Sequence, residues 1–312
     1  MIRSILLAAS RNPWLERQFR TRKFTRRAVR RFMPGETLDE ALEAAREERS
    51  RGAGVLLTLL GENVADRDAA IGVSDHYRTV LERFRTGGMA DGDGPRSEVS
   101  VKLTHLGLDL GDEVAGEALE RILNGPEGGG GQVWVDMEDS SYVDRTLGIY
   151  FDLLSDHPKL GICLQSYLYR TPEDLARVLE AGGSIRLVKG AYREPAEVAF
   201  PKKADVDQAY LDLGRVLRER PPADGRRHVL GTHDPKMIEG ILGSDGPPRG
   251  EGSLEVQMLY GIARETQREL LDRGVPFGVL ISYGEEWFPW YMRRLAERPA
   301  NIGFVLRSVF RS

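Results

Sequence analysis

The chain of 312 residues has little cysteine and no long apolar segment. Its single cysteine, Cys163, excludes an internal disulfide and any cysteine-rich metal site, so no metal is expected. Cys163 stands in the apolar run 160–164, which favours a buried thiol that packs as a small hydrophobic side chain. No apolar run approaches the length of about 18 residues that a transmembrane helix needs.

An excess of charge of one sign is also absent. The sequence has 44 Lys and Arg residues against 48 Asp and Glu residues, and the net charge of −4 gives no reason to expect a nucleic-acid partner. The apolar patch within residues 1–10 is too short for a secretory signal, and no small-residue cleavage site follows it. A cytoplasmic location is therefore expected.

Two nucleotide-binding motifs are missing as well. No GxGxxG follows an apolar run, and no GxxxxGK[ST] occurs. The glycine-rich segment 125–131 leads into an expected strand rather than a helix, so it is no phosphate loop. A dinucleotide, if one binds, is not held in the Rossmann manner.

The first 50 residues are predicted to be helical and are uneven in charge. A basic stretch runs from Arg17 to Arg31, and an acidic helix is expected from Thr37 to Arg51. The basic stretch suits contact with an anionic membrane surface, and the alternative is a solvated helix packed on the body through its few apolar residues. We therefore divide the chain into an N-terminal helical arm, 1–50, and a second domain, 51–312.

A regular alternation of apolar runs and helical stretches begins after residue 50. Runs that are typical of buried strands separate stretches of helical composition such as 66–85, 144–155, 172–180 and 204–218. Eight such runs predict an α/β fold in which a parallel sheet closes into a (β/α)₈ TIM-like barrel. The eight runs are 54–60, 98–103, 132–137, 160–166, 184–189, 228–231, 254–259 and 275–282.

Charged and polar side chains gather where these runs end. In a barrel of this kind the active site lies at the carboxyl ends of the strands. Lys102 and Asp136 end neighbouring runs and can form an ion pair. Arg186 and Lys189 then remain as a surplus of cations, to which the last helix adds Arg293. Such a surplus suits an anionic substrate, an anionic reduced cofactor, or both.

Seven motifs in sequence order resemble those of the proline dehydrogenase family, and the resemblance runs from about residue 50 to the C-terminus. The length is similar to that of the compact monofunctional bacterial type. The motifs are Val101-Lys-Leu-Thr104, Asp136-Met-Glu-Asp139, Leu164-Gln-Ser-Tyr-Leu-Tyr-Arg170, Arg186-Leu-Val-Lys-Gly-Ala-Tyr192, Gly231-Thr-His-Asp234, Glu255-Val-Gln-Met-Leu-Tyr-Gly261 and Arg293-Arg-Leu-Ala-Glu297.

The resemblance implies a flavoprotein that holds FAD and oxidises L-proline to 1-pyrroline-5-carboxylate, with a quinone as electron acceptor. It assigns Asp136 as the active-site carboxylate and Arg186 as the arginine beside the reactive flavin nitrogen. Substrate-binding roles fall to Lys102, Tyr192, Arg293 and Arg294, with Glu297 supporting the two arginines. Cofactor-binding roles fall to Met137, Gln165, Arg186, Lys189, Gly190, Ala191, Thr232 and His233.

Two positions depart from the family pattern. Leu280 and Trp290 stand where family members usually carry tyrosines that pack on the substrate ring. Loss of a phenol alters packing and removes a hydroxyl partner, each worth about 1–3 kcal/mol. One reading is a preference for a proline analogue, larger at its far side or substituted on nitrogen. The other is neutral variation that lowers efficiency on proline.

Two other classes of function remain open. The first is a lyase or aldolase barrel that uses Lys102 or Lys189 as a Schiff-base amine, with Asp136 as proton carrier. The second is a non-catalytic descendant that binds an amino acid as a sensor. A bound flavin that proline reduces would separate the proposed dehydrogenase from both.

Overall fold

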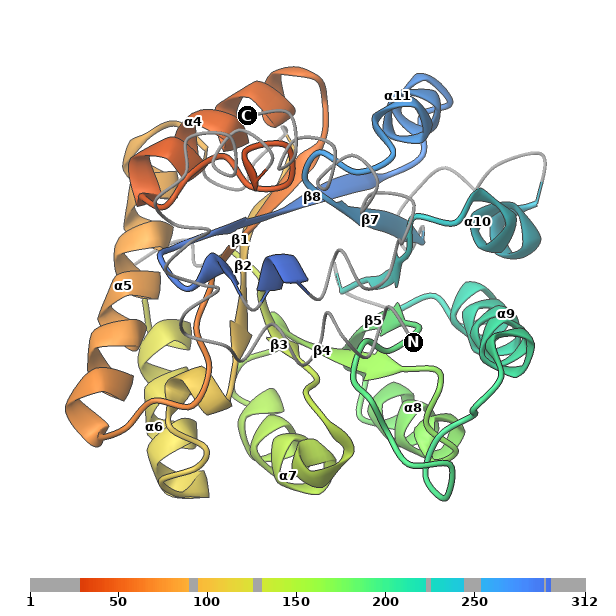
Figure 1. Cartoon of the computed structure of the whole chain (residues 1–312), viewed down its shortest axis with the longest axis horizontal. Helices are drawn as coiled ribbons and strands as arrows, with labels where there is room; N and C mark the ends of the chain where they lie inside the picture. Colours follow the sequence, from red (N-terminus) through yellow and green to blue (C-terminus); the bar gives the residue numbers. More distant parts are fainter. Residues whose placement is uncertain are drawn as a thin grey trace, which may run out of the picture.

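Eight parallel strands form a closed barrel in which each strand pairs with its neighbour in the sequence and β8 pairs with β1 (Figure 1). This computed structural model describes residues 29–89, 95–125, 131–222, 226–243, 254–288 and 290–292. It confirms the predicted barrel. The strands are β1 (Gly54–Leu59), β2 (Ser97–Lys102), β3 (Val133–Asp136), β4 (Leu160–Gln165), β5 (Ser184–Val188), β6 (His228–Gly231), β7 (Glu255–Leu259) and β8 (Phe277–Tyr283).

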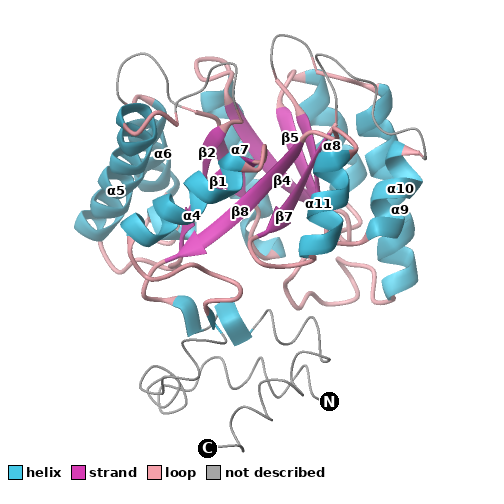
Figure 2. Ribbon diagram, turned by 90° about the horizontal axis from the view of Figure 1, so that it is seen from above, coloured by secondary structure: helices cyan, strands magenta, loops and turns pink. Residues whose placement is uncertain are grey.

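Helices follow the strands and cover the outside of the barrel (Figure 2). Local capping explains where several of them begin; Asp66, for instance, accepts a hydrogen bond from Ala69 N at the start of its helix. Short 3-10 helices, η1 (Thr104–Leu106) and η2 (Ser140–Tyr142), precede two of them. The helices are α5 (Arg67–Thr86), α6 (Asp112–Leu123), α7 (Val143–Leu154), α8 (Thr171–Glu180), α9 (Lys203–Glu219), α10 (Pro235–Leu242) and α11 (Arg264–Asp272).

Helix α4 (Leu38–Ser50) precedes the barrel in the sequence but packs on it beside β1 and β8 (Figure 1). A capping box between Thr37 and Glu40 starts this helix. Its apolar face, with Leu42 fully buried, belongs to the same core as the strands. The division of the chain at residue 50 stays a prediction, and α4 itself shares the core of the barrel.

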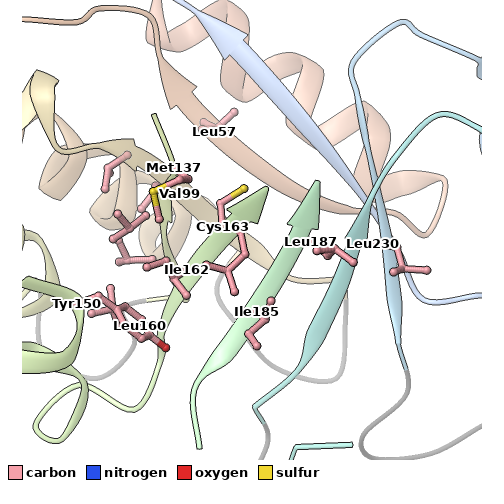
Figure 3. Packing of buried hydrophobic residues seen from close by; sticks show 14 of the residues in the cluster. Leu57, Val99, Met137, Tyr150, Leu160, Ile162, Cys163, Ile185, Leu187 and Leu230 are labelled. Carbon is pink, nitrogen blue, oxygen red and sulfur yellow. The ribbon is translucent and has the colours of Figure 1, made fainter. Parts of the chain in front are cut away.

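The strands alternate between an outer and an inner face. Outward side chains such as Ile162, Ile185 and Leu187 form the main core under the helices (Figure 3). Inward side chains of Leu56, Trp134 and Val229 form a separate apolar cluster within the barrel. This period of two places every second residue of a strand in the interior, so polar residues near a strand's carboxyl end face the mouth of the barrel.

No helix in the described part of the chain is long and apolar enough to cross a membrane. Most of the basic stretch predicted between Arg17 and Arg31 lies outside the described residues. At its described end Arg30 forms an exposed ion pair with Glu40 at 3.4 Å. An isolated exposed pair of this kind contributes about 0–1 kcal/mol to stability.

Candidate active site

A cavity of about 410 Å³ opens at the carboxyl ends of the strands, where polar strand ends from around the barrel meet. A volume of this size matches small-molecule and cofactor sites in proteins, roughly 300–1,000 Å³. Every predicted site residue that the structure describes lines it. These residues are Lys102, Asp136, Met137, Gln165, Arg186, Lys189, Gly190, Ala191, Tyr192, Thr232, His233, Leu280 and Trp290. Arg293, Arg294 and Glu297 lie outside the described residues, so their roles stay predictions.

Arg186 of β5 and Asp136 of β3 form the central ion pair of the cavity. Ser100 of β2 joins them, because its Oγ accepts a hydrogen bond from Arg186 Nη2 at 2.7 Å and donates to Asp136 Oδ1 at 2.9 Å. Burial disfavours the charged guanidinium, but Asp136, Cys163 and Glu255 together outweigh that effect and raise the pKa of Arg186 above its ordinary value. Arg186 therefore remains a fixed cation in the cavity.

The prediction of an ion pair between Lys102 and Asp136 is wrong. The two residues are register partners on β2 and β3, yet the carboxylate of Asp136 turns to Arg186. Among the described residues no ion pair joins Lys102 to a carboxylate. Lys102 lines the cavity, where its ammonium group can meet an anionic ligand.

Lys189 is held by two carboxylates on the opposite side of the cavity from β1. Its Nζ lies 2.6 Å from Asp207 Oδ1 on α9 and 3.2 Å from Asp234 Oδ2 after β6. Lys203 also pairs with Asp207, and the two lysines lower the pKa of that carboxyl although burial opposes them. The positive charge of Lys189 is therefore largely balanced, and the surplus of cations is smaller than the sequence indicates.

His233 and Gln165 present neutral polar atoms to the cavity. His233 Nε2 accepts a hydrogen bond from Leu259 N at 2.9 Å, so in the neutral ring the proton is on Nδ1. Gln165 Nε2 donates to Met137 O at 3.4 Å, whereas Gln165 Oε1 is buried without a partner among the described residues. A buried acceptor without a partner costs about 1–3 kcal/mol, which favours a ligand that supplies a donor.

Leu280 of β8 and Trp290 give the cavity an apolar patch beside Ser282. Leu280 packs at the edge of the inner cluster that contains Trp134. Trp290, in the helical turn after β8, is buried in a second cluster with Trp287 and Met33. Both residues that depart from the family pattern therefore face the same cavity as Lys102 and Arg186.

The sequence interpretation missed several residues that contribute to this site. Ser100 does not line the cavity but bonds both members of the central ion pair, and the other missed residues line the cavity itself. Most lie two positions from a predicted site residue on the same strand, so the period of two was the available signal. Cys163 is buried in the core as expected, and it also lines the cavity. Burial raises the pKa of its thiol, although nearby Arg186 opposes the shift. The missed residues are Thr58, Ser100, Cys163 and Ser282, whereas Gln257 belongs to a motif of the family resemblance that was given no role at the site.

A closed parallel barrel with a charged cavity at its carboxyl end is the architecture of a barrel enzyme. A family model described as proline dehydrogenase matches residues 41–307. The chain belongs to the proline dehydrogenase family.

Full-length relatives carry the same name. Proline dehydrogenase 1 of Bacillus subtilis strain 168 is 34% identical over 314 residues, which covers 100% of both chains. Proline dehydrogenase of Deinococcus radiodurans is 32% identical over 319 residues and covers 100% of this chain and 98% of the relative. These relatives confirm the predicted resemblance to monofunctional bacterial proteins.

A solved structure shares the fold. Proline utilization A (PutA) from Bdellovibrio bacteriovorus, inactivated by N-propargylglycine, superposes with a TM-score of 0.77 at 24% sequence identity. The match covers 88% of this chain and 33% of that one, so this chain spans about a third of its length. At that identity the likeness supports the fold of the barrel and nothing finer.

Proposed function

We propose that this protein oxidises L-proline to 1-pyrroline-5-carboxylate, with FAD as the hydride acceptor and a quinone as the final acceptor of the electrons. The observation that carries the proposal is the Arg186–Asp136 pair, in which Arg186 is buried and Asp136 partly exposed, and which shares one cavity with Lys102 at the carboxyl end of the barrel. Family membership and the names of the full-length relatives support the same activity.

The residues of the cavity fit a flavin. Gln165 Oε1 is a buried acceptor of the kind to which a ring N–H donates, and Arg186 is a fixed cation suited to a ring that gains negative charge. Gly190, which lines the cavity, has a φ of +108°, and a Cβ at this position would approach the ring of Tyr167 to 2.4 Å. The backbone conformation and the close contact both favour glycine at this position. The cofactor would be held by Met137, Gln165, Arg186, Lys189, Gly190, Ala191, Thr232 and His233.

The chain's own residues would bind and orient the substrate. Lys102 would hold the carboxylate together with Arg293 and Arg294, and Glu297 would support those arginines. Tyr192 would cover the ring. Fixing the carboxylate end orients the ring carbon next to nitrogen for hydride loss, which converts binding energy into favourable geometry.

Proton control falls to the carboxylate of the central ion pair. Hydride loss requires a neutral amine, so the proton of an ammonium substrate has to leave first. Asp136 is the carboxylate in the cavity with a fixed orientation, because Arg186 and Ser100 both bind its Oδ1. It would hold the proton directly or through one water. Bound FAD supplies the hydride acceptor.

The apolar patch of Leu280 and Trp290 would decide which ring is preferred. With these two residues in place of tyrosines, the patch suits a proline analogue with a larger far side or a substituent on nitrogen. Comparison of kcat/KM for proline, hydroxyproline, pipecolate and N-methylproline tests this part of the proposal. A clear preference for unsubstituted proline would remove it and leave the dehydrogenase activity intact.

The place of the reaction would be the cytoplasm, with access to the inner face of the membrane for a quinone. The basic stretch before residue 31 supports this part through its affinity for anionic lipid, about 1 kcal/mol per Lys or Arg near the surface. Co-sedimentation with anionic vesicles tests it. Equal sedimentation with neutral and anionic vesicles would count against it.

The test of the whole proposal is a visible spectrum of the purified protein, followed by anaerobic addition of proline. Bleaching of a band at about 450 nm would establish the cofactor and the class of reaction together. A colourless protein that borohydride traps on a carbonyl substrate would instead support a Schiff-base lyase. The Nζ of Lys189 is bound by Asp207 and Asp234, and this engagement disfavours that amine as a nucleophile. A flavin that no cyclic amino acid reduces would support the non-catalytic reading.

A further inference from the structure

A chain of buried polar side chains runs inside the barrel from the cavity toward the amino ends of the strands. At the cavity Arg186 pairs with Asp136. At the other end Arg227, just before β6, pairs with Glu98 of β2 and Glu255 of β7. All three side chains of this lower cluster are at most 8% exposed. Charges so deep in a protein require partners, so the lower cluster is a fixed feature of the fold.

Gln257 of β7 links the two ends of this chain. Its Nε2 donates to Glu255 Oε1 at 2.8 Å, and its Oε1 accepts from Arg186 Nη1 at 3.4 Å. A guanidinium only donates and a carboxylate only accepts, so the carboxamide satisfies both neighbours in a single orientation. Gln257 is buried and lines the cavity. The anchored carboxylate of Glu255 thereby fixes the carboxamide, and the carboxamide limits where Arg186 can point.

Trp134 supports the same arrangement from β3. Its Nε1 donates to Glu98 Oε2 at 2.8 Å, which fixes the indole to the lower cluster. The guanidinium of Arg186 lies 5.3 Å from the ring centroid and that of Arg227 lies 5.5 Å from it. Both distances are within the range of a cation–π contact. Arg186 is therefore held by Asp136 on one side, and through Gln257 and Trp134 by the lower cluster.

We propose that Gln257 is a positioning residue that sets the direction of the Arg186 guanidinium in the cavity, and with it the stabilisation of the reduced flavin. This inference rests on the proposed function. Without Gln257, Arg186 would keep Asp136 and Ser100 as partners but lose the contact on its Nη1 side. A guanidinium that turns away from developing charge stabilises it less, because such stabilisation depends on groups oriented in advance.

The test compares Gln257→Met with a matched control, Gln132→Met, in the full-length flavin-loaded protein. Gln132 is also a buried carboxamide of the interior, and its Oε1 accepts from Arg227 Nε at 3.2 Å, but it does not line the cavity. Both variants lose a buried hydrogen bond to the same chain of charges. If the role of Gln257 were merely structural, both variants would have a lower melting temperature, and the midpoint potential of the bound flavin would change in neither.

Three quantities are measured for each variant: the midpoint potential of the bound flavin, kcat for proline and KM for proline. For Gln257→Met we expect about a tenfold weaker stabilisation of the reduced flavin, which lowers the potential of a two-electron couple by about 30 mV. We also expect kcat to fall about tenfold while KM changes less than about twofold, the signature of an interaction lost in the transition state. Gln132→Met should match the wild type in all three.

A second variant, Gln257→Asn, guards against failure of the first to fold. It keeps a carboxamide, but the shorter side chain cannot reach both Glu255 and Arg186, so the same direction of change is expected. Equal potentials in the Gln257 variants and Gln132→Met would overturn the inference while leaving the proposed function intact. A wild-type protein that proline does not reduce would overturn the proposed function, and the inference with it.

Discussion

The ion pair between Arg186 and Asp136 can be tested by its contribution to stability as well as to catalysis. The Arg186 side chain is 5% exposed and that of Asp136 19%. Asp136→Asn keeps the size of the side chain, removes the counter-charge and leaves Arg186 with the neutral partners Ser100 and Gln257. Breaking a buried ion pair from one side costs about 3–5 kcal/mol. Because Asp136 is partly exposed, we expect the lower limit, about 3 kcal/mol or roughly a hundredfold in the folding equilibrium.

The control for this measurement is an exposed ion pair on α9. Asp212 and Arg215 lie 3.2 Å apart with side chains 58% and 51% exposed, so Asp212→Asn should cost less than about 1 kcal/mol. Urea unfolding followed by circular dichroism at pH 7 gives both values from the same protein. If Asp136→Asn is no less stable than Asp212→Asn, the central pair is not desolvated as the structure indicates, and the account of a fixed cation in the cavity fails.

Two further predictions concern the interior of the barrel. Arg227→Met should lower the unfolding free energy by about 3–5 kcal/mol, because Glu98 remains buried without its cation and Glu255 keeps only Arg96, at 3.8 Å. Adding Glu98→Gln and Glu255→Gln should recover at least half of that loss in the same urea titration, and no recovery would refute the electrostatic cause. Burial lowers the pKa of His228 to about 4, so its neutral form stabilises the fold fully above pH 6.5 and less as the pH falls toward 4. Between pH 7 and pH 4.5 the wild type should lose about 2 kcal/mol more than His228→Asn, and equal losses would contradict the assignment.

The sequence by itself determined the order of the elements. The eight apolar runs match the eight strands to within two residues at each end, and the expected helix 204–218 is observed as α9, Lys203–Glu219. The reason is local: hydrophobic period, capping residues and turn residues act over a few positions. Active sites of such barrels lie at the carboxyl ends of the strands, so the sequence also predicted that polar residues such as Lys102 and His233 share one cavity, as they do in the structure.

Only the tertiary structure decided which of those polar groups pair. Register makes Lys102 and Asp136 neighbours, yet the longer Arg186 reaches Asp136 from β5, two strands away. Lys189 pairs with Asp207 of α9, and no local pattern in the sequence predicts this contact between a strand end and a helix. Side chains inside a barrel share one closed space, so their partners depend on length and direction across that space and not on order along the chain.

The position of α4 illustrates the same division between local and global information. Its capping box and apolar face are readable from residues 37–50, so the helix itself could be predicted. Its docking on β1 and β8 depends on the last strand, more than 200 residues away in the sequence. The apolar face of α4 predicts that the helix packs against another part of the protein. The surface against which it packs forms only when β8 closes the barrel beside β1.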